Sequence, residues 1–232
     1  MGELQYLFLI VASLLMMAAQ IMVQSAYSRY AKVENGSGLT GKDVAEDILA
    51  RNGWTDVKIG QSSGGELSDH FDPTKMIVNL SPGVYNGRSI AAAAIAAHEL
   101  GHIMQHQTGY SAITLRNRIL PAAIVASNIS WGVIMLGVFI ANYSGSFGVF
   151  YAGLALIGVV GAFQLVTLPV EFNASSRALK MVNEYGYISG DQGKEGAKKV
   201  LNAAAFTYIA ALASTIFTIL RLVLSVAGNR KR

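Results

Sequence analysis

Two histidines and a glutamate lie within about one helical turn in the stretch AHELGHI, at His98, Glu99 and His102. Residues four apart lie on one face of an α-helix, so His98 and His102 can offer their imidazoles to a single point. Two neutral imidazoles make half of a tetrahedral zinc site. Glu99 lies about 100° around the helix from His98, where it can take a proton from water beside the metal. This H-E-x-x-H pattern predicts the chemistry of a metallopeptidase; the alternative is a buried histidine pair in a helix bundle.

Such a site needs a third protein ligand, because a catalytic zinc uses three side chains and keeps its fourth position open. His106 is excluded by geometry, since it lies about 12 Å along a helix axis from His98 and zinc ligands must be neighbours. The extended pattern H-E-x-x-H-x-x-G-x-x-H also fails, because Gln105 and Thr108 stand at its last two positions. The third ligand is therefore His70 or a carboxylate.

The region around the motif mixes helical and strand patterns. Helix formers fill residues 89–107, with Ser89 as the N-cap and Gly109 as the stop. Upstream, GKDVAEDILARNG predicts a short amphipathic helix ended by Gly53. The stretches TDVKIGQ and KMIVNLS alternate as strands do. KMIVNL is either an edge strand that pairs with an extended substrate or an ordinary core strand.

The composition indicates a membrane protein with a modest polar part, because 52% of the 232 residues are hydrophobic and only 14% are charged. The chain has no cysteine, which excludes disulfides and thiolate metal sites. The net charge of +4 is small, and no basic run carries interleaved aromatics, so we expect no nucleic-acid partner. The closing NRKR is interpreted as an anchor at a helix end.

Four apolar runs are each longer than the ~20 residues that cross a bilayer. The first is interpreted as a retained anchor rather than a cleaved signal peptide, because no positive segment precedes it. The sequence therefore divides into a transmembrane anchor at 4–27, a catalytic region at 28–118, a transmembrane hairpin at 119–168, a polar helical region at 169–202 and a transmembrane helix at 203–228. The expected fold class is mainly α, a multi-pass membrane protein with about four transmembrane helices and a small α+β zincin-like catalytic region.

Glu171 is the best carboxylate for the third ligand position. Only NYSGS joins the second and third apolar runs, so they form a hairpin that returns the chain to the side it left. Glu171 then emerges on the same membrane face as the HELGH helix, and Pro169 suits the first turn of a new helix there. The alternative role for Glu171 is a carboxylate that interacts with the dipole of that helix N-terminus.

These segments together resemble the YugP-like neutral zinc metallopeptidases of bacteria. The resemblance covers most of residues 25–205 and is carried by DHFDPTKMIVNLSPGVYNGRSIAAAAIAAHELGH, AAHELGHIMQH and LPVEFNASSRAL. More distantly, the chain is similar to the HtpX-type membrane proteases, whose third zinc ligand is the glutamate of an E-x-x-A-D pattern. That similarity puts Glu171 at the ligand position and Ala174 at the alanine, while Ser175 stands where the acid would be.

The resemblance implies Zn²⁺ as the cofactor, a gluzincin-like site and peptide hydrolysis. The departure at Ser175 removes the carboxylate that would orient the histidines, and Asn173 or Ser176 is the expected substitute. The partners we expect are a peptide or membrane-protein substrate and the lipid bilayer.

The expected mechanism uses zinc to activate water, with Glu99 as the general base. The expected zinc ligands are His98, His102 and Glu171. The tetrahedral oxyanion needs a further hydrogen-bond donor, for which His70 is the candidate and Tyr85, Tyr110 and Arg177 are alternatives. His70 could equally be a loop histidine without a role.

The charge distribution favours a cytoplasmic active site in an integral protein of the bacterial plasma membrane. The two polar regions hold most of the 18 Lys and Arg residues, and the loop NYSGS holds none. The alternatives to a peptidase are an inactive membrane scaffold with the same fold, a zinc amidase or esterase of small substrates, and a transporter. A transporter is disfavoured because the runs carry almost no ionisable residue at mid-depth. Glycines in the runs are interpreted as sites of close helix packing: Gly132, Gly137, Gly153, Gly158 and Gly161.

Overall fold

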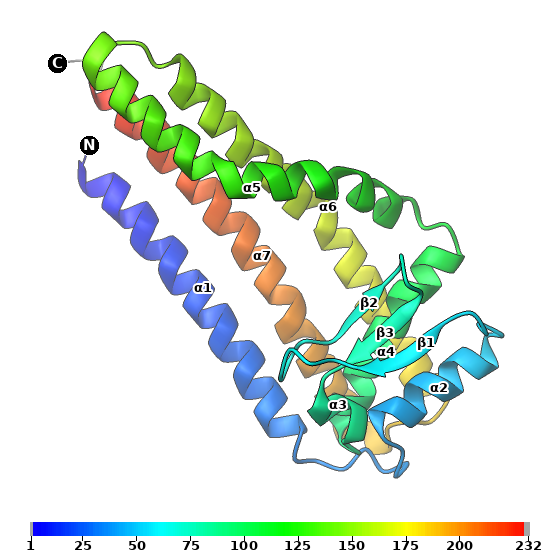
Figure 1. Ribbon diagram of the computed structural model, residues 1–232. Coiled ribbons are helices and arrows are strands. Elements are labelled where there is room, and N and C mark those ends of the chain that lie inside the picture. The colour runs from blue at the N-terminus through cyan, green and yellow to red at the C-terminus, as the bar shows by residue number, and fades with distance from the viewer. Residues whose placement is uncertain (1, 230–232) are drawn as a thin grey trace. The chain divides into compact units, whose positions relative to one another are not determined.

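A computed structural model describes residues 2–229, which form mainly helices and one small sheet (Figure 1). In chain order the elements are α1 (Gly2–Tyr30), α2 (Gly41–Arg51), β1 (Lys58–Gln61), β2 (His70–Asp72), β3 (Ile77–Leu80), α3 (Pro82–Asn86), α4 (Ile90–Gln107), α5 (Ser111–Ser144), α6 (Gly148–Glu184) and α7 (Gly190–Asn229). Within the described residues, the helices long and apolar enough to cross a membrane are α1, α5, α6 and α7. The predicted fold class is confirmed. The last three residues of NRKR lie outside the described residues.

The described chain forms two compact units. One contains residues 2–19, 112–169 and 207–229, and the other contains residues 20–111 and 170–206. The first unit therefore holds most of the apolar length of the chain. The second holds the HELGH motif together with the polar segments, including the stretch that carries Glu171.

Glycines let the helices of the first unit approach closely at some positions only. A Cβ added at Gly137 would lie 2.3 Å from a backbone nitrogen of α6, and one at Gly153 would lie 2.9 Å from a backbone nitrogen of α5. Gly161 makes an ordinary contact at 3.4 Å. Gly132 and Gly158 have no described neighbour within 4 Å of such a Cβ, so their interpretation as packing sites is wrong.

Pro169 lies inside α6 and does not begin a new helix, which corrects the sequence prediction. A proline in a helix removes one backbone hydrogen bond, a loss that apolar membrane helices tolerate when nearby groups satisfy the backbone. Because α6 is continuous, Glu171 stands far from the helix N-terminus, and the alternative role of a carboxylate at the dipole does not apply.

In the second unit, α4 is the central helix and is buried on nearly all sides. A helix that is apolar all around is one that other elements enclose. Its alanines pack into a core with buried residues of four neighbouring elements: Val44 and Ile48 of α2, Val78 and Leu80 of β3, Ala178 and Val182 of α6, and Ala197 and Leu201 of α7. The predicted N-cap is confirmed, since the Ser89 hydroxyl accepts from Ala92 N at 3.1 Å. Gly109, with φ +63°, follows the helix end.

The three strands form a sheet in the order β1-β3-β2, with β1 parallel and β2 antiparallel to β3 (Figure 1). The strands expected in TDVKIGQ and KMIVNLS are confirmed as β1 and β3, while β2 was not predicted. KMIVNL therefore supplies the middle strand, and its interpretation as a substrate-pairing edge is wrong. The alternative is correct, because Val78 and Leu80 are fully buried in the core.

Candidate metal centre

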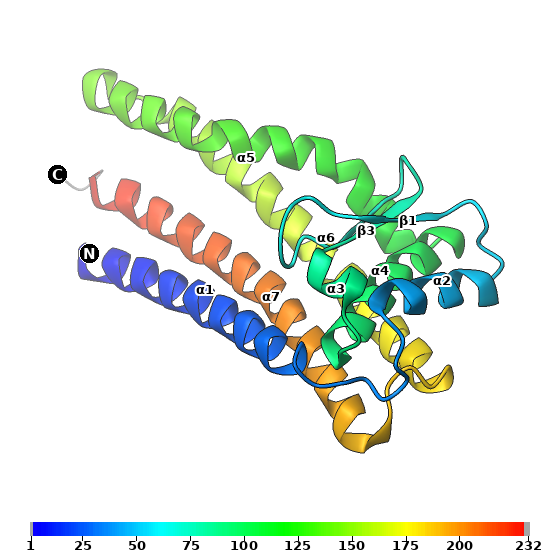
Figure 2. The same cartoon turned by 60° about the horizontal axis from the view of Figure 1, so that its bottom comes forward.

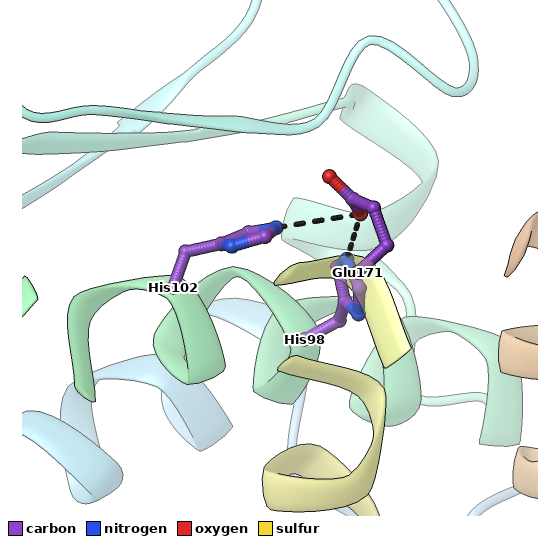
Figure 3. Close-up of side chains that lie close together, drawn as sticks. All are labelled: His98, His102 and Glu171. Atoms are coloured by element: carbon purple, nitrogen blue, oxygen red, sulfur yellow. Dashed lines mark ion pairs between the residues drawn. The ribbon is translucent and has the colours of Figure 1, made fainter. Parts of the chain in front are cut away.

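His98 and His102 project from the same face of α4 toward Glu171 of α6 (Figure 3). Glu171 Oε2 lies 3.4 Å from His98 Nε2 and 3.6 Å from His102 Nε2. One ligand atom from each residue lies within 4.8 Å of the other two, and Glu171 is buried. Within residues 2–229, this is the one group of three metal-ligating side chains found so close together.

The donor spacing fits a metal better than direct hydrogen bonds. Two atoms that each lie about 2.0–2.1 Å from a tetrahedral zinc are about 3.3 Å apart. The carboxylate-to-imidazole distances of 3.4 and 3.6 Å are close to that edge length. By contrast, a contact at 3.6 Å is too long to be a hydrogen bond. Two imidazoles and one carboxylate are also a donor set that zinc accepts, so the residues present fit the ion.

Gly101 allows α6 to approach α4 at this centre. A Cβ at this position would lie 2.6 Å from the carbonyl oxygen of Ala174 and 3.2 Å from that residue's Cα. Ala174 is fully buried and lies one turn beyond Glu171 on α6. The two ligand-bearing helices therefore approach each other closely where Gly101 of HELGH meets Ala174 of α6.

Ser175 orients His98, although it stands where the E-x-x-A-D pattern has its acid. Its hydroxyl lies 3.2 Å from His98 Nδ1, and the side chain is almost fully buried. With the Nδ1–H donated to this hydroxyl, the Nε2 lone pair of His98 faces Glu171. The expected substitutes were Asn173 or Ser176; the structure gives the contact with His98 to Ser175 instead.

Gln105 orients His102 and ties α4 to α6, a role that the sequence analysis missed. Its Oε1 accepts from His102 Nδ1 at 3.0 Å. Its amide nitrogen donates to the Val170 carbonyl oxygen at 2.7 Å and to Asn173 Oδ1 at 3.1 Å. Asn173 Oδ1 also accepts from Arg177 Nε at 2.8 Å. Gln105 is fully buried, so one side chain positions a ligand and holds the backbone just before Glu171.

The carboxylate of Glu171 governs the charge state of His102. Burial lowers the pKa of His102, but the nearby carboxylate of Glu171, aided by Glu99 and Gln105, outweighs it and raises that pKa. The negative charge of Glu171 therefore favours the protonated form of His102 when no metal is present. A divalent cation between them would replace that proton.

Glu99 is buried beside the centre, with 7% of its surface exposed. Its negative charge helps to raise the pKa of His102. Burial and, to a smaller degree, the charge of Glu99 raise the pKa of Asp69 to about 6, against the opposing effect of the Ser81 N–H. Glu99 therefore lies within electrostatic reach of both the ligand His102 and the carboxyl of Asp69.

His70 is not brought into the three-residue group. It lies exposed on β2, with Nδ1 2.9 Å from the Ser68 carbonyl oxygen and Nε2 3.2 Å from Asn79 Nδ2. In this arrangement Nδ1 donates and Nε2 accepts, so a neutral His70 has no free N–H to offer an oxyanion. The next residue on β2, Phe71, contacts α4, because its ring centroid lies 6.2 Å from that of His106.

The alternative oxyanion donors lie in separate surroundings. The Arg177 guanidinium lies 6.0 Å from the Tyr110 ring, so these two residues contact one another. Tyr85 lies beside Lys42, whose amine is 5.8 Å from its ring. Arg177 connects to the centre through the Asn173 and Gln105 hydrogen bonds, which makes it part of the support of His102.

Comparison with known proteins agrees with the geometry. The family model described as "Putative neutral zinc metallopeptidase" matches residues 5–227. The chain is 42% identical over 226 residues to the "Putative membrane protease YugP" of Bacillus subtilis (strain 168), a match that covers 97% of this chain and 98% of that protein. No solved structure matches the chain. Together with the four apolar helices, the similarity to a membrane protease indicates an integral membrane protein.

Proposed function

This chain belongs to the family described as "Putative neutral zinc metallopeptidase", and from that premise we propose that it hydrolyses peptide bonds with a zinc ion held by His98, His102 and Glu171. The observation that carries the proposal is the convergence of three donors within 4.8 Å, although the glutamate follows the second histidine by 69 positions in the sequence. Hydrogen bonds to the far nitrogen of each imidazole support it, because zinc ligands commonly have such partners.

When bound, zinc supplies a Lewis acid that polarises a peptide carbonyl and lowers the pKa of water. Glu99 takes the proton of the attacking water on its carboxylate and delivers it to the leaving amine. The burial of Glu99 and its electrostatic effect on His102 support this role. Ser175 and Gln105 keep the Nδ1–H groups of the two histidines engaged, so that both Nε2 lone pairs stay turned toward the ligand position.

The proposed substrate is an extended peptide or a segment of a membrane protein. Strand β2 pairs with β3 on one side and is an edge of the sheet in the order β1-β3-β2. It lies over the end of α4, where Phe71 meets His106. An edge strand can pair with a substrate backbone by β-augmentation, so the edge proposed for this purpose is β2 rather than KMIVNL.

The test compares hydrolysis of casein and of a small ester by zinc-loaded protein, with Glu99→Gln and the exposed control Glu46→Gln. We expect casein cleavage that Glu99→Gln lowers roughly 1,000-fold without loss of zinc, and that Glu46→Gln leaves unchanged. Hydrolysis of the ester alone would favour a small-molecule esterase. Zinc-loaded wild-type protein that cleaves neither substrate would favour the inactive scaffold.

The proposed orientation places the centre on the cytoplasmic face of the bacterial plasma membrane. Because the chain has no cysteine, single cysteines report the sidedness of each loop. Ser146 in the α5–α6 loop and Ser63 beside the sheet are both exposed. In intact cells an impermeant maleimide should label Ser146→Cys, and it should label Ser63→Cys only after lysis. The reverse pattern would place the centre outside.

A further inference from the structure

A groove separate from the metal centre lies between the end of α1 and the beginning of α7. Both segments belong to the second unit, and Figure 2 shows the blue end of α1 beside the orange start of α7. The groove is open to solvent and has a volume of about 570 Å³. The two helices meet beside it, where a Cβ at Gly196 would lie 2.7 Å from the Tyr30 ring. None of the candidate zinc ligands lines it.

One part of the groove is cationic. Arg29 of α1 and Lys199 of α7 both line it, and no carboxylate does. Within residues 2–229, neither side chain takes part in an ion pair. Arg29 instead lies over the Tyr30 ring at 5.6 Å. Two cations face the same space without a counter-charge, so the groove has the electrostatics of an anion site.

Another part of the groove is apolar and belongs to the apolar runs of two candidate membrane spans. Ile21 and Met22, which are 60% and 46% exposed, line it together with Phe206. No charged residue lies between Glu3 and Arg29, or between Lys199 and Arg221. The two cations therefore mark the points where two candidate membrane spans meet the polar part of the chain. Cations at such points lie at the level of lipid headgroups.

We propose that this groove binds one anionic phospholipid, with its phosphodiester between Arg29 and Lys199 and its first methylenes against Ile21, Met22 and Phe206. A soluble phosphate would use the cations alone and leave the apolar wall in contact with water. A zwitterionic lipid would bring its own cation to a site that already holds two. An anionic lipid places its phosphodiester between the two cations and its methylenes against the apolar wall. It also fits the location of the groove, where the two candidate membrane spans meet the polar part of the chain.

The experiment titrates delipidated, detergent-solubilised protein and measures the first bound lipid by native mass spectrometry. The probes are phosphatidylglycerol, phosphatidylcholine, the deacylated headgroup glycerophosphoglycerol and inorganic phosphate. We expect phosphatidylglycerol to bind at least tenfold more tightly than each of the others. Arg29→Gln and Lys199→Gln should each weaken it about fivefold, and the double variant about 25-fold.

Two further variants keep the result interpretable. Lys199→Arg keeps the charge and should bind within twofold of wild type, whereas Lys198→Gln removes the neighbouring charge, which does not line the groove, and should have no effect. All the substituted side chains are exposed, so folding should be preserved, and an unchanged elution volume checks it. Equal binding of the two lipids, phosphate competition at equal concentration, or a double variant that binds like wild type would each overturn the proposal.

Discussion

The change Gly101→Ala should disable the metal centre without touching any ligand. The added Cβ would lie 2.6 Å from the Ala174 carbonyl oxygen, whereas an ordinary contact begins at 3.4 Å. The Cβ and the carbonyl oxygen are both fixed to the backbone, so α4 and α6 must separate by about 0.4 Å to reach the 3.0 Å limit of real Cβ contacts, and by about 0.8 Å to reach an ordinary contact. Zinc–ligand distances tolerate changes of only about 0.2 Å. A shift of that size would carry Glu171 away from the imidazoles on the other helix.

The expected loss can be given a magnitude. Loss of a partner that merely orients a ligand costs about 10–100-fold in metal affinity, and displacement of a ligand should cost at least as much. The change in global stability is a poorer readout, because two effects oppose each other. Overpacking destabilises by about 1–3 kcal/mol, while replacing a helical glycine by alanine stabilises by about 1 kcal/mol. The assay is therefore zinc affinity, measured by competition with a chromophoric chelator on detergent-purified protein.

The matched control is Gly132→Ala, which also lies within a helix but has no described neighbour within 4 Å of the new Cβ. It should keep wild-type zinc affinity and gain up to about 1 kcal/mol in stability. If Gly101→Ala binds zinc as tightly as the control, then close approach of the two helices does not set the ligand geometry, and the reasoning fails.

Three further predictions concern the support of the histidines. Gln105→Met removes the acceptor of the His102 Nδ1–H and leaves the Val170 carbonyl without its side-chain donor, so zinc affinity should fall about 10–100-fold. The control Gln107→Met changes an exposed residue of the same helix and should not alter zinc affinity. Equal affinities of the two variants would contradict the role of Gln105. Ser175→Ala should lower zinc affinity roughly tenfold and Ser175→Asp should raise it above wild type, as the same chelator titration would reveal; the opposite order would show that the hydroxyl does not orient its histidine. Because Glu171 raises the pKa of His102, the metal-free protein holds that proton to a higher pH, and zinc affinity measured across pH should still be rising above the ordinary histidine pKa of about 6.5; a plateau below it would contradict the shift.

Local patterns were sufficient to predict the helix that carries HELGH. Its alanines, the Ser89 cap and the stop at Gly109 act within a few residues of one another, so no tertiary information is needed. The same holds for α2 and for β1 and β3. Strand β2 was missed because three residues are too few for alternation to be recognised, and it forms only by pairing with β3.

Which side chains orient the histidines depends on how α4 packs against α6, and local sequence patterns do not predict that packing. Gln105 follows His102 by three residues and so shares its helix face, a pattern that could have been noticed. Ser175 gave no comparable indication, because its contact with His98 spans 77 residues. The general preference of proline for the first turn predicts a helix start at Pro169, but an apolar helix tolerates the missing hydrogen bond and α6 continues through this residue.

The ligand set is tested most directly by zinc stoichiometry and X-ray absorption on wild-type protein beside Glu171→Ala, with the exposed Glu184→Ala of the same helix as control. We predict one zinc per chain, coordinated by two imidazole nitrogens and a carboxylate oxygen, retained in Glu184→Ala and lost or greatly weakened in Glu171→Ala. Full zinc with an unchanged coordination spectrum in Glu171→Ala would contradict the account, because the third ligand would then be another residue.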